Sequence, residues 1–305
     1  MSENFKILIA YDGSRWAEAA LDDLTNAGLK ETGVEALVYS VAEVWLPPSE
    51  SAEEQDSMPE PVRKRYAENL EILNQAKVSA GKAAERLRHM FPGWKVDSDA
   101  TYGSAAWEIL AKADEMQSDL IVVGPQGKSN LDRVLIGSVS QKVATEAKCS
   151  VRVARGKVEV DDAPVRIVIG YDGSNGAEEA VREVSERNWK KGSEARVIIV
   201  EDTALIRRSL AIEAEKLEET GKQIIDRLNS ENLSAELIIR EGNPKQILIE
   251  EAENWSANAI FVGAANFEGF VARYLIGSVS SAVITRASCS VEIVRPGRGG
   301  ELTEL

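Results

Sequence analysis

The chain has 305 residues, enough for two domains of ordinary size, and its 44% of hydrophobic residues can fill a core in each. A formal net charge of −14 argues against a nucleic-acid partner, because proteins that bind nucleic acids need a basic surface. Two cysteines, Cys149 and Cys289, exclude a disulfide scaffold and fit a reducing compartment.

The first half of the chain alternates strand and helix patterns. Its start, MSENFKILIAYDGS, has no basic segment followed by a long apolar stretch, and no apolar run approaches the roughly 20 residues of a membrane span. We therefore expect a soluble, cytoplasmic protein without a membrane partner. Apolar runs predict strands at 5–10, 34–42, 95–102, 120–123 and 150–154. Helical patterns predict helices at about 15–28, 62–90, 105–116 and 138–147. The Pro-rich, acidic segment 46–61 predicts a mobile loop, and 156–164 a linker.

The second half repeats the first. ILIAYDGS at 7–14 recurs as IVIGYDGS at 167–174, a shift of 160, and LIGSVS at 135–140 recurs at 275–280, a shift of 140. The copies are colinear, and the second lacks the acidic loop. It is expected to form strands at 165–170, 195–200, 235–240, 259–262 and 290–294. Its helices are expected at 177–189, 204–228, 244–255 and 278–287. We place the two domains at residues 1–157 and 163–297.

Both copies predict an α/β fold. Continuous Val and Ile runs separated by helices indicate a parallel sheet covered on both faces, so we expect two tandem, open, doubly wound sheets of the Rossmann-like class. Ligands of such sheets bind beyond the carboxyl ends of the strands. The residues directly after each strand are therefore the ones to inspect.

Two segments of the first copy follow strands at that edge. Asp12 comes directly after the first strand, where Gly13 permits a tight turn and Ser14 can cap the next helix. After the fourth strand, Gly124 and Gly127 let the backbone approach an anion closely. The helix that opens at 137–140 would present its unpaired N–H groups to a phosphate. The simpler alternative is that both segments are only strand-to-helix turns.

The pattern Gly124-x2-Gly127-x9-Gly137-Ser138, with Asp12 after the first strand, resembles the ATP-binding pattern of universal stress proteins. The runs DLIVVG at 119–124 and VRVA at 151–154 look like the same family, and the resemblance covers nearly the whole chain as two modules. It implies five parallel strands in each module, in the order 3-2-1-4-5, with ATP between strands one and four.

The resemblance also implies roles for individual residues. Asp12 would meet the ribose or a Mg²⁺ ion on the phosphates, and the backbone of Val41 would read the adenine edge. The phosphates would be held by Gly124, Gly127, Gly137, Ser138, Val139 and Ser140. Lys128 would add charge or remain a solvated loop residue. Since the family commonly dimerises by its last strand, the two modules are expected to pack as an intramolecular pseudo-dimer through 150–154 and 290–294.

The second copy departs from this pattern. It keeps Asp172, Gly263, Gly277, Ser278, Val279 and Ser280. Its second glycine is replaced by Asn266 or Phe267, whose side chains would crowd a phosphate, although Gly269 could restore the turn in a shifted register. We expect a damaged site there.

These observations predict an ATP-binding stress-response or signalling protein in which nucleotide in the first domain tunes conformation or partner binding. No catalytic residue is assigned, since only Asp12 could act as a base near the glycines, and at most slow hydrolysis is expected. Two alternatives stay open: a slow Mg-dependent ATPase or phosphotransferase, and an interaction scaffold without ligand. A homodimer of the tandem chain also stays open.

Overall fold

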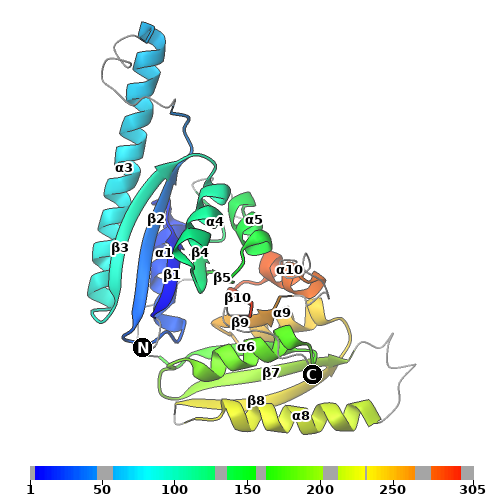
Figure 1. The fold of residues 1–305 in the computed structure, drawn as a ribbon. Coiled ribbons are helices and arrows are strands. Elements are labelled where there is room, and N and C mark those ends of the chain that lie inside the picture. Colours follow the sequence, from blue (N-terminus) through cyan, green and yellow to red (C-terminus); the bar gives the residue numbers. More distant parts are fainter. Residues whose placement is uncertain are drawn as a thin grey trace.

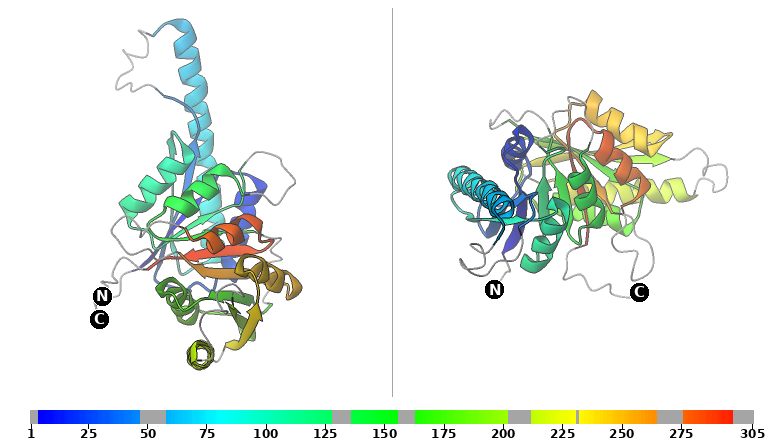
Figure 2. Two further views of the ribbon diagram at one scale, coloured as in Figure 1. Left: turned by 90° about the vertical axis from the view of Figure 1, so that its right-hand side faces the viewer. Right: turned by 90° about the horizontal axis from the view of Figure 1, so that it is seen from above.

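The computed structural model describes residues 4–46, 58–127, 136–155, 163–201, 212–230, 232–264 and 276–296. Within them, ten strands form one sheet in the order β3-β2-β1-β4-β5-β10-β9-β6-β7-β8. Figures 1 and 2 show that the strands of the first half and those of the second half lie side by side in this one sheet. Among the described helices, none is both long and apolar enough to cross a bilayer.

The first half supplies β1 to β5 and the helices between them. Its strands are β1 (Phe5–Ala10), β2 (Val34–Ala42), β3 (Lys95–Tyr102), β4 (Leu120–Val123) and β5 (Ser150–Val153). Its helices are α1 (Arg15–Asp23), the short 3-10 turn η1 (Leu24–Asn26), α3 (Glu60–Met90), α4 (Ala105–Met116) and α5 (Ser138–Glu146). All strand pairs within this half are parallel, as expected for strands joined by helical crossovers.

The second half repeats the same order of elements. Its strands are β6 (Arg166–Tyr171), β7 (Ser193–Glu201), β8 (Leu233–Glu241), β9 (Ala259–Gly263) and β10 (Ser290–Val294). Its helices are α6 (Asn175–Glu186), α8 (Ile212–Leu228), α9 (Pro244–Asn254) and α10 (Ser278–Arg286). Again every strand pair inside the half is parallel.

Each half has the strand order 3-2-1-4-5 expected from the sequence, and the two five-stranded sheets join edge to edge into one sheet. β5 and β10 pair antiparallel, with Val291 opposite Val153, Glu292 opposite Arg152 and Ile293 opposite Val151. The physical reason is that a free β5 or β10 would expose a row of unpaired N–H and C=O groups, which their mutual pairing satisfies. A single ten-stranded sheet results, with β3 and β8 at its edges.

Several element ends differ from those expected. α3 begins at Glu60 with Pro61 in its first turn, so the segment predicted as a loop at 46–61 ends earlier than expected. Residues 47–57 of that segment and 156–162 of the linker lie outside the described residues. The first part of α3 extends beyond the sheet, as Figures 1 and 2 show, and most of its side chains up to Val78 are exposed.

The core is continuous on one face of the sheet and divided on the other. On the face covered by α4, α5, α9 and α10, one apolar cluster includes Ile109 and Val143 from the first half together with Leu248 and Val283 from the second. On the opposite face, α1 and α3 cover one cluster and α6 and α8 another. The shared cluster makes the two halves one packed body.

Candidate functional site

The candidate site begins where β1 ends at the carboxyl edge of the sheet. Asp12 follows the strand, and its Oδ1 accepts a hydrogen bond of 2.9 Å from the backbone N–H of Ser14. Gly13 takes φ +75°, the left-handed conformation that glycine adopts at little cost. Ser14 then caps α1 by accepting a hydrogen bond of 3.1 Å from the Ala17 N–H. This turn holds the carboxylate of Asp12 beside the N-terminus of α1.

Gly127 lies against the Asp12 carboxylate. A Cβ atom at Gly127 would lie 3.0 Å from Asp12 Oδ2, tighter than nine in ten real Cβ contacts. Glycine at position 127 therefore allows the loop backbone to lie close to this carboxylate.

The turn before α5 lies next to the same loop. The Gly137 N–H donates a hydrogen bond of 2.6 Å to the Pro125 carbonyl, and a Cβ at Gly137 would be 3.4 Å from Gln126 Cα. Gly137 is the N-cap of α5, and no side chain among the described residues caps this helix there. The first N–H groups of α5, at Ser138, Val139 and Ser140, have no partner within the helix and form the positive end of its dipole.

Ser140 ties α5 to the end of β4. Its hydroxyl donates a hydrogen bond of 2.6 Å to the Gly124 carbonyl, and the side chain is buried. A Cβ at Gly124 would in turn lie 3.0 Å from the carbonyl oxygen of Trp16 in α1. The Ser140 hydroxyl hydrogen is thus used inside the protein, and Gly124 permits the close packing of β4 on α1.

Val41 lies near the end of β2, opposite Thr101 of β3 in the register of the sheet. The neighbouring Ser40 donates a hydrogen bond of 2.5 Å to the Tyr11 carbonyl, directly before Asp12. The end of β2 is therefore fixed against the end of β1, and Val41 and Asp12 belong to the same edge of the sheet.

A group of charged and phenolic side chains supports α1 behind the site. Tyr11 is hydrogen-bonded to Glu18, which also contacts Arg86 of α3 at 2.5 Å, and Arg86 pairs with Asp22. Burial, together with the hydrogen bond to Glu18 and its negative charge, raises the pKa of Tyr11 to about 12. No group of three or more potential metal ligands occurs among the described residues.

The second half contains the same turn but a closer contact. Asp172 Oδ1 accepts from the Ser174 N–H at 3.0 Å, and Ser280 donates to the Gly263 carbonyl at 2.7 Å, as their counterparts do in the first half. Gly277 is the N-cap of α10, which begins at Ser278. However, a Cβ at Gly263 would lie only 2.2 Å from the carbonyl carbon of Gly176. α6 thus approaches β9 more closely than α1 approaches β4.

The match to known families settles the relationship of the chain. The model of the Universal stress protein family matches residues 3–155 and again residues 165–295. The chain belongs to the universal stress protein family. It is a stress-response protein built as a tandem pair of the family's modules.

Individual universal stress proteins resemble parts or all of the chain. Universal stress protein MJ0531 of Methanocaldococcus jannaschii is 34% identical over 86 residues, which span 28% of this chain and 51% of that protein. Universal stress protein YxiE of Bacillus subtilis is 34% identical over 155 residues, 49% of this chain and 98% of that protein. A universal stress protein structure from Archaeoglobus fulgidus covers 97% of this chain and 99% of its own, with a TM-score of 0.64 at 21% identity, which shows a shared fold.

The sequence reasoning missed the residue that distinguishes the two modules of this universal stress protein. Trp16 and Gly176 are related by the same shift of 160 residues as the two YDGS motifs, so the repeat itself carries the signal. The missing side chain at Gly176 allows the close approach of α6 to Gly263. The predicted roles of Lys128, Asn266, Phe267 and Gly269 fall on residues outside the described ranges.

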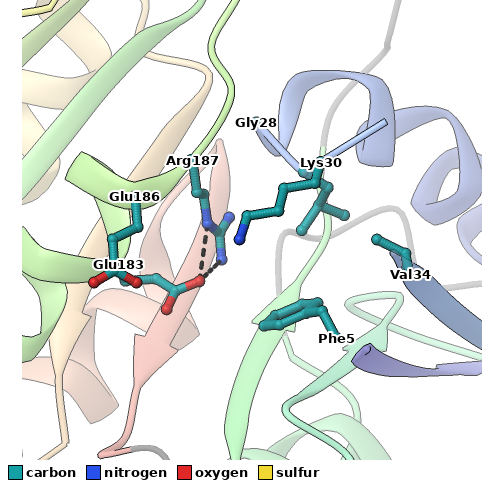
Figure 3. A pocket seen from close by; sticks show the side chains of 8 residues that line it. Phe5, Gly28, Lys30, Val34, Glu183, Glu186 and Arg187 are labelled. Carbon is teal, nitrogen blue, oxygen red and sulfur yellow. Dashed lines mark hydrogen bonds and ion pairs between the residues drawn. The ribbon is translucent and has the colours of Figure 1, made fainter. Parts of the chain in front are cut away.

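A small pocket lies elsewhere, at the junction of the two modules (Figure 3). Phe5, Lys30 and Val34 of the first half face Glu183 and Arg187 of the second across it. Its volume of about 60 Å³ is well below the few hundred Å³ of typical ligand pockets, so it is a packing gap and not the candidate site.

Proposed function

We propose that the first half of this universal stress protein binds an adenine nucleotide, principally ATP, between the carboxyl ends of β1 and β4. The observation that carries the proposal is the glycine backbone at 127 beside the Asp12 carboxylate, where a Cβ would lie 3.0 Å from Oδ2. A glycine next to a carboxylate, at the ligand-binding edge of a parallel sheet, is what a bound ribose and phosphate chain would require.

The start of α5 would hold the phosphates. Its N-terminal N–H groups at Ser138 and Val139 are free of a side-chain cap within the described residues, whereas Ser14 and Ser174 cap α1 and α6. An uncapped helix N-terminus favours an anion through both its N–H donors and its dipole. We assign Ser140 to positioning Gly124 and not to contacting phosphate, because its hydroxyl hydrogen is already used.

Asp12 and Val41 would contact the nucleoside part. The Oδ1 atom of Asp12 is held by Ser14, which directs Oδ2 toward Gly127, where it would accept from a ribose hydroxyl or join the phosphates in holding Mg²⁺. The backbone of Val41 at the end of β2 would hydrogen-bond the adenine edge.

The second half would serve a different purpose. Because Gly176 packs closely on Gly263, α6 lies nearer to β9 than α1 lies to β4, and we assign nucleotide binding to the first half alone. The second half completes the sheet through β10 and would act as the first half's permanent partner in an intramolecular pseudo-dimer. Nucleotide in the first half would then tune the conformation or partner binding of the joined molecule.

A matched pair of glycine variants tests nucleotide binding. Gly127→Ala places a Cβ against Asp12, whereas Gly81→Ala in α3 places one 4.0 Å from its nearest neighbour, Ser98 Oγ. We expect Gly127→Ala to weaken ATP binding by at least about tenfold in equilibrium dialysis, the equivalent of about 1.4 kcal/mol. Gly81→Ala should bind like the wild type. The proposal would be contradicted if all three proteins bound ATP with equal affinity. It would also be contradicted if purified wild-type protein released no adenine nucleotide and did not bind ATP when ATP was added.

A further inference from the structure

The contact between β5 and β10 has a two-fold symmetric register centred on Arg152 and Glu292. These two residues are directly opposite each other and lie 140 residues apart, the shift that relates the two copies in this region. The flanking pairs, Val291 with Val153 and Ile293 with Val151, exchange under the same shift. Arg152 and Glu292, which we call the axis pair, are therefore equivalent positions that meet on the pseudo-two-fold axis.

The axis pair is buried within a chain of alternating charges. Arg152 and Glu292 are both 0% exposed, and Arg152 Nη1 donates to Glu292 Oε2 at 3.2 Å. On one side, Arg152 Nε donates to Asp23 Oδ2 at 2.6 Å. On the other side, Arg187 Nη1 donates to Glu292 Oε2 at 3.0 Å and also pairs with Glu183. Although burial alone lowers the pKa of Arg152, the two carboxylates beside it raise that pKa above its ordinary value, so the guanidinium stays charged.

The polar contacts made by Ser150, Ser290, Arg155 and Arg295 include equivalent hydrogen bonds in both directions. The Ser290 hydroxyl accepts from the Arg155 N–H at 2.8 Å, and the Ser150 hydroxyl accepts from the Arg295 N–H at 3.1 Å. The Arg155 side chain donates to the Ile284 carbonyl at the end of α10, and Arg295 donates to the equivalent Ala144 carbonyl at the end of α5. Since both halves supply identical groups here, these contacts would form equally well between two first halves or two second halves.

The halves differ at the centre of the interface and at contacts beside it, such as the hydrogen bond of 2.7 Å from Arg187 Nη1 to the Ala27 carbonyl. The axis pair is the position at which the two halves carry opposite charges. In a pair of first halves, two buried guanidinium groups would face each other on the axis, and in a pair of second halves two carboxylates would do so. Each group would keep its neighbour, Asp23 or Arg187, but would lose the hydrogen bond across the axis and meet a like charge instead. Like charges opposed in a buried interface suppress the wrong partner.

We propose that the axis pair of Arg152 and Glu292 makes this interface heterotypic, so that the β5 edge accepts the β10 edge of a second half and rejects another β5. β5 and β10 therefore pair with each other within one chain. Two or more chains do not join through like halves.

Cutting the folded protein between its halves tests the proposal. A protease site placed between Arg155 and Ala163 removes the advantage that covalent linkage gives to intramolecular pairing. After cleavage, the two halves are unfolded together in urea and refolded together, and native mass spectrometry then distinguishes pairs of unlike halves from pairs of like halves by mass. For the wild type we expect unlike pairs at least about tenfold above random pairing. The double variant Arg152→Leu with Glu292→Leu, which makes the axis identical in both halves, should shift toward random pairing.

The wild type and the double variant each have a result that would contradict the proposal. The proposal would be overturned if the cleaved wild type formed pairs of like halves as often as random pairing predicts. It would also be overturned if the halves separated and did not pair. Exclusive unlike pairing in the double leucine variant would assign the selectivity to another contact and would also overturn it. If that variant does not fold, Arg152→Gln with Glu292→Gln provides the same neutral, symmetric axis with polar side chains. Intact wild-type and variant chains are compared by circular dichroism as the control for folding.

Discussion

At the scale of single residues, equivalent serines make the same hydrogen bond in the two halves, but only one of them lies in the proposed nucleotide site. Ser140 and Ser280 both donate a hydroxyl hydrogen bond to the glycine carbonyl that ends the preceding strand. Ser140→Ala and Ser280→Ala should each lower the free energy of unfolding by about 1–2 kcal/mol, because a buried acceptor loses its donor. Chemical denaturation measures this loss.

The same two variants should differ in nucleotide binding. Only Ser140→Ala releases Gly124 in the proposed site, so only this variant is expected to bind ATP more weakly when assayed by equilibrium dialysis. Equal weakening by Ser280→Ala would show that the second half takes part in binding.

Tyr11 predicts a stability change at alkaline pH. Its pKa is raised to about 12 by burial and by Glu18, compared with about 10 in an unfolded chain. Because the folded state holds the phenol proton more tightly, this contribution is complete below pH 10 and disappears as pH rises from about 10 to 12. Tyr11→Phe should therefore give a shallower decline of unfolding free energy over that interval. Parallel pH curves for wild type and variant would contradict this assignment.

At the scale of elements, the two halves differ in how closely α6 approaches β9 and α1 approaches β4. Gly263→Ala would place a Cβ 2.2 Å from the backbone of Gly176, whereas Gly124→Ala would place one 3.0 Å from the Trp16 carbonyl. We expect Gly263→Ala to cost about 3 kcal/mol of unfolding free energy and Gly124→Ala about 1 kcal/mol, because a contact of 2.2 Å forces the two backbones apart, whereas one of 3.0 Å requires only a small shift. Urea unfolding of both variants decides this. A larger loss for Gly124→Ala would contradict the closer approach of α6 to β9.

Most elements could be predicted because their signals are local. Apolar runs marked the strands, and the repeat placed β6 to β10 by analogy with β1 to β5. The start of α3 was wrong by about one half-turn, since Glu60 and Pro61 belong to a segment whose composition is that of a loop but whose proline suits a helix N-terminus.

Contacts between distant residues were harder to predict. The turn at Asp12 and the cap at Ser14 depend on neighbouring residues and are in the structure as expected. The axis pair depends on residues 140 apart, and aligning VRVA with VEIV would have shown only opposite charges at one position, not their burial. The commitment of Ser140 to the Gly124 carbonyl likewise needed three-dimensional geometry.

At the scale of the whole molecule, the halves should unfold together. One apolar cluster runs through both halves on one face of the sheet, and Arg155 and Arg295 each reach the last turn of a helix in the opposite half. Separating the halves would expose this cluster and leave those buried groups without partners. Calorimetry of the intact chain is expected to show a single transition. Two separate transitions, one for each half, would contradict a shared core.

The molecule contains two similar folds, and we propose that it has one nucleotide site. Asp12 and Asp172 offer a matched comparison, because each carboxylate holds the N–H of the serine two residues on. Isothermal titration calorimetry with ATP and Mg²⁺ measures both affinity and stoichiometry. We predict one site per chain, lost in Asp12→Ala and retained in Asp172→Ala. Two sites per chain, or loss of binding in Asp172→Ala with retention in Asp12→Ala, would contradict the account.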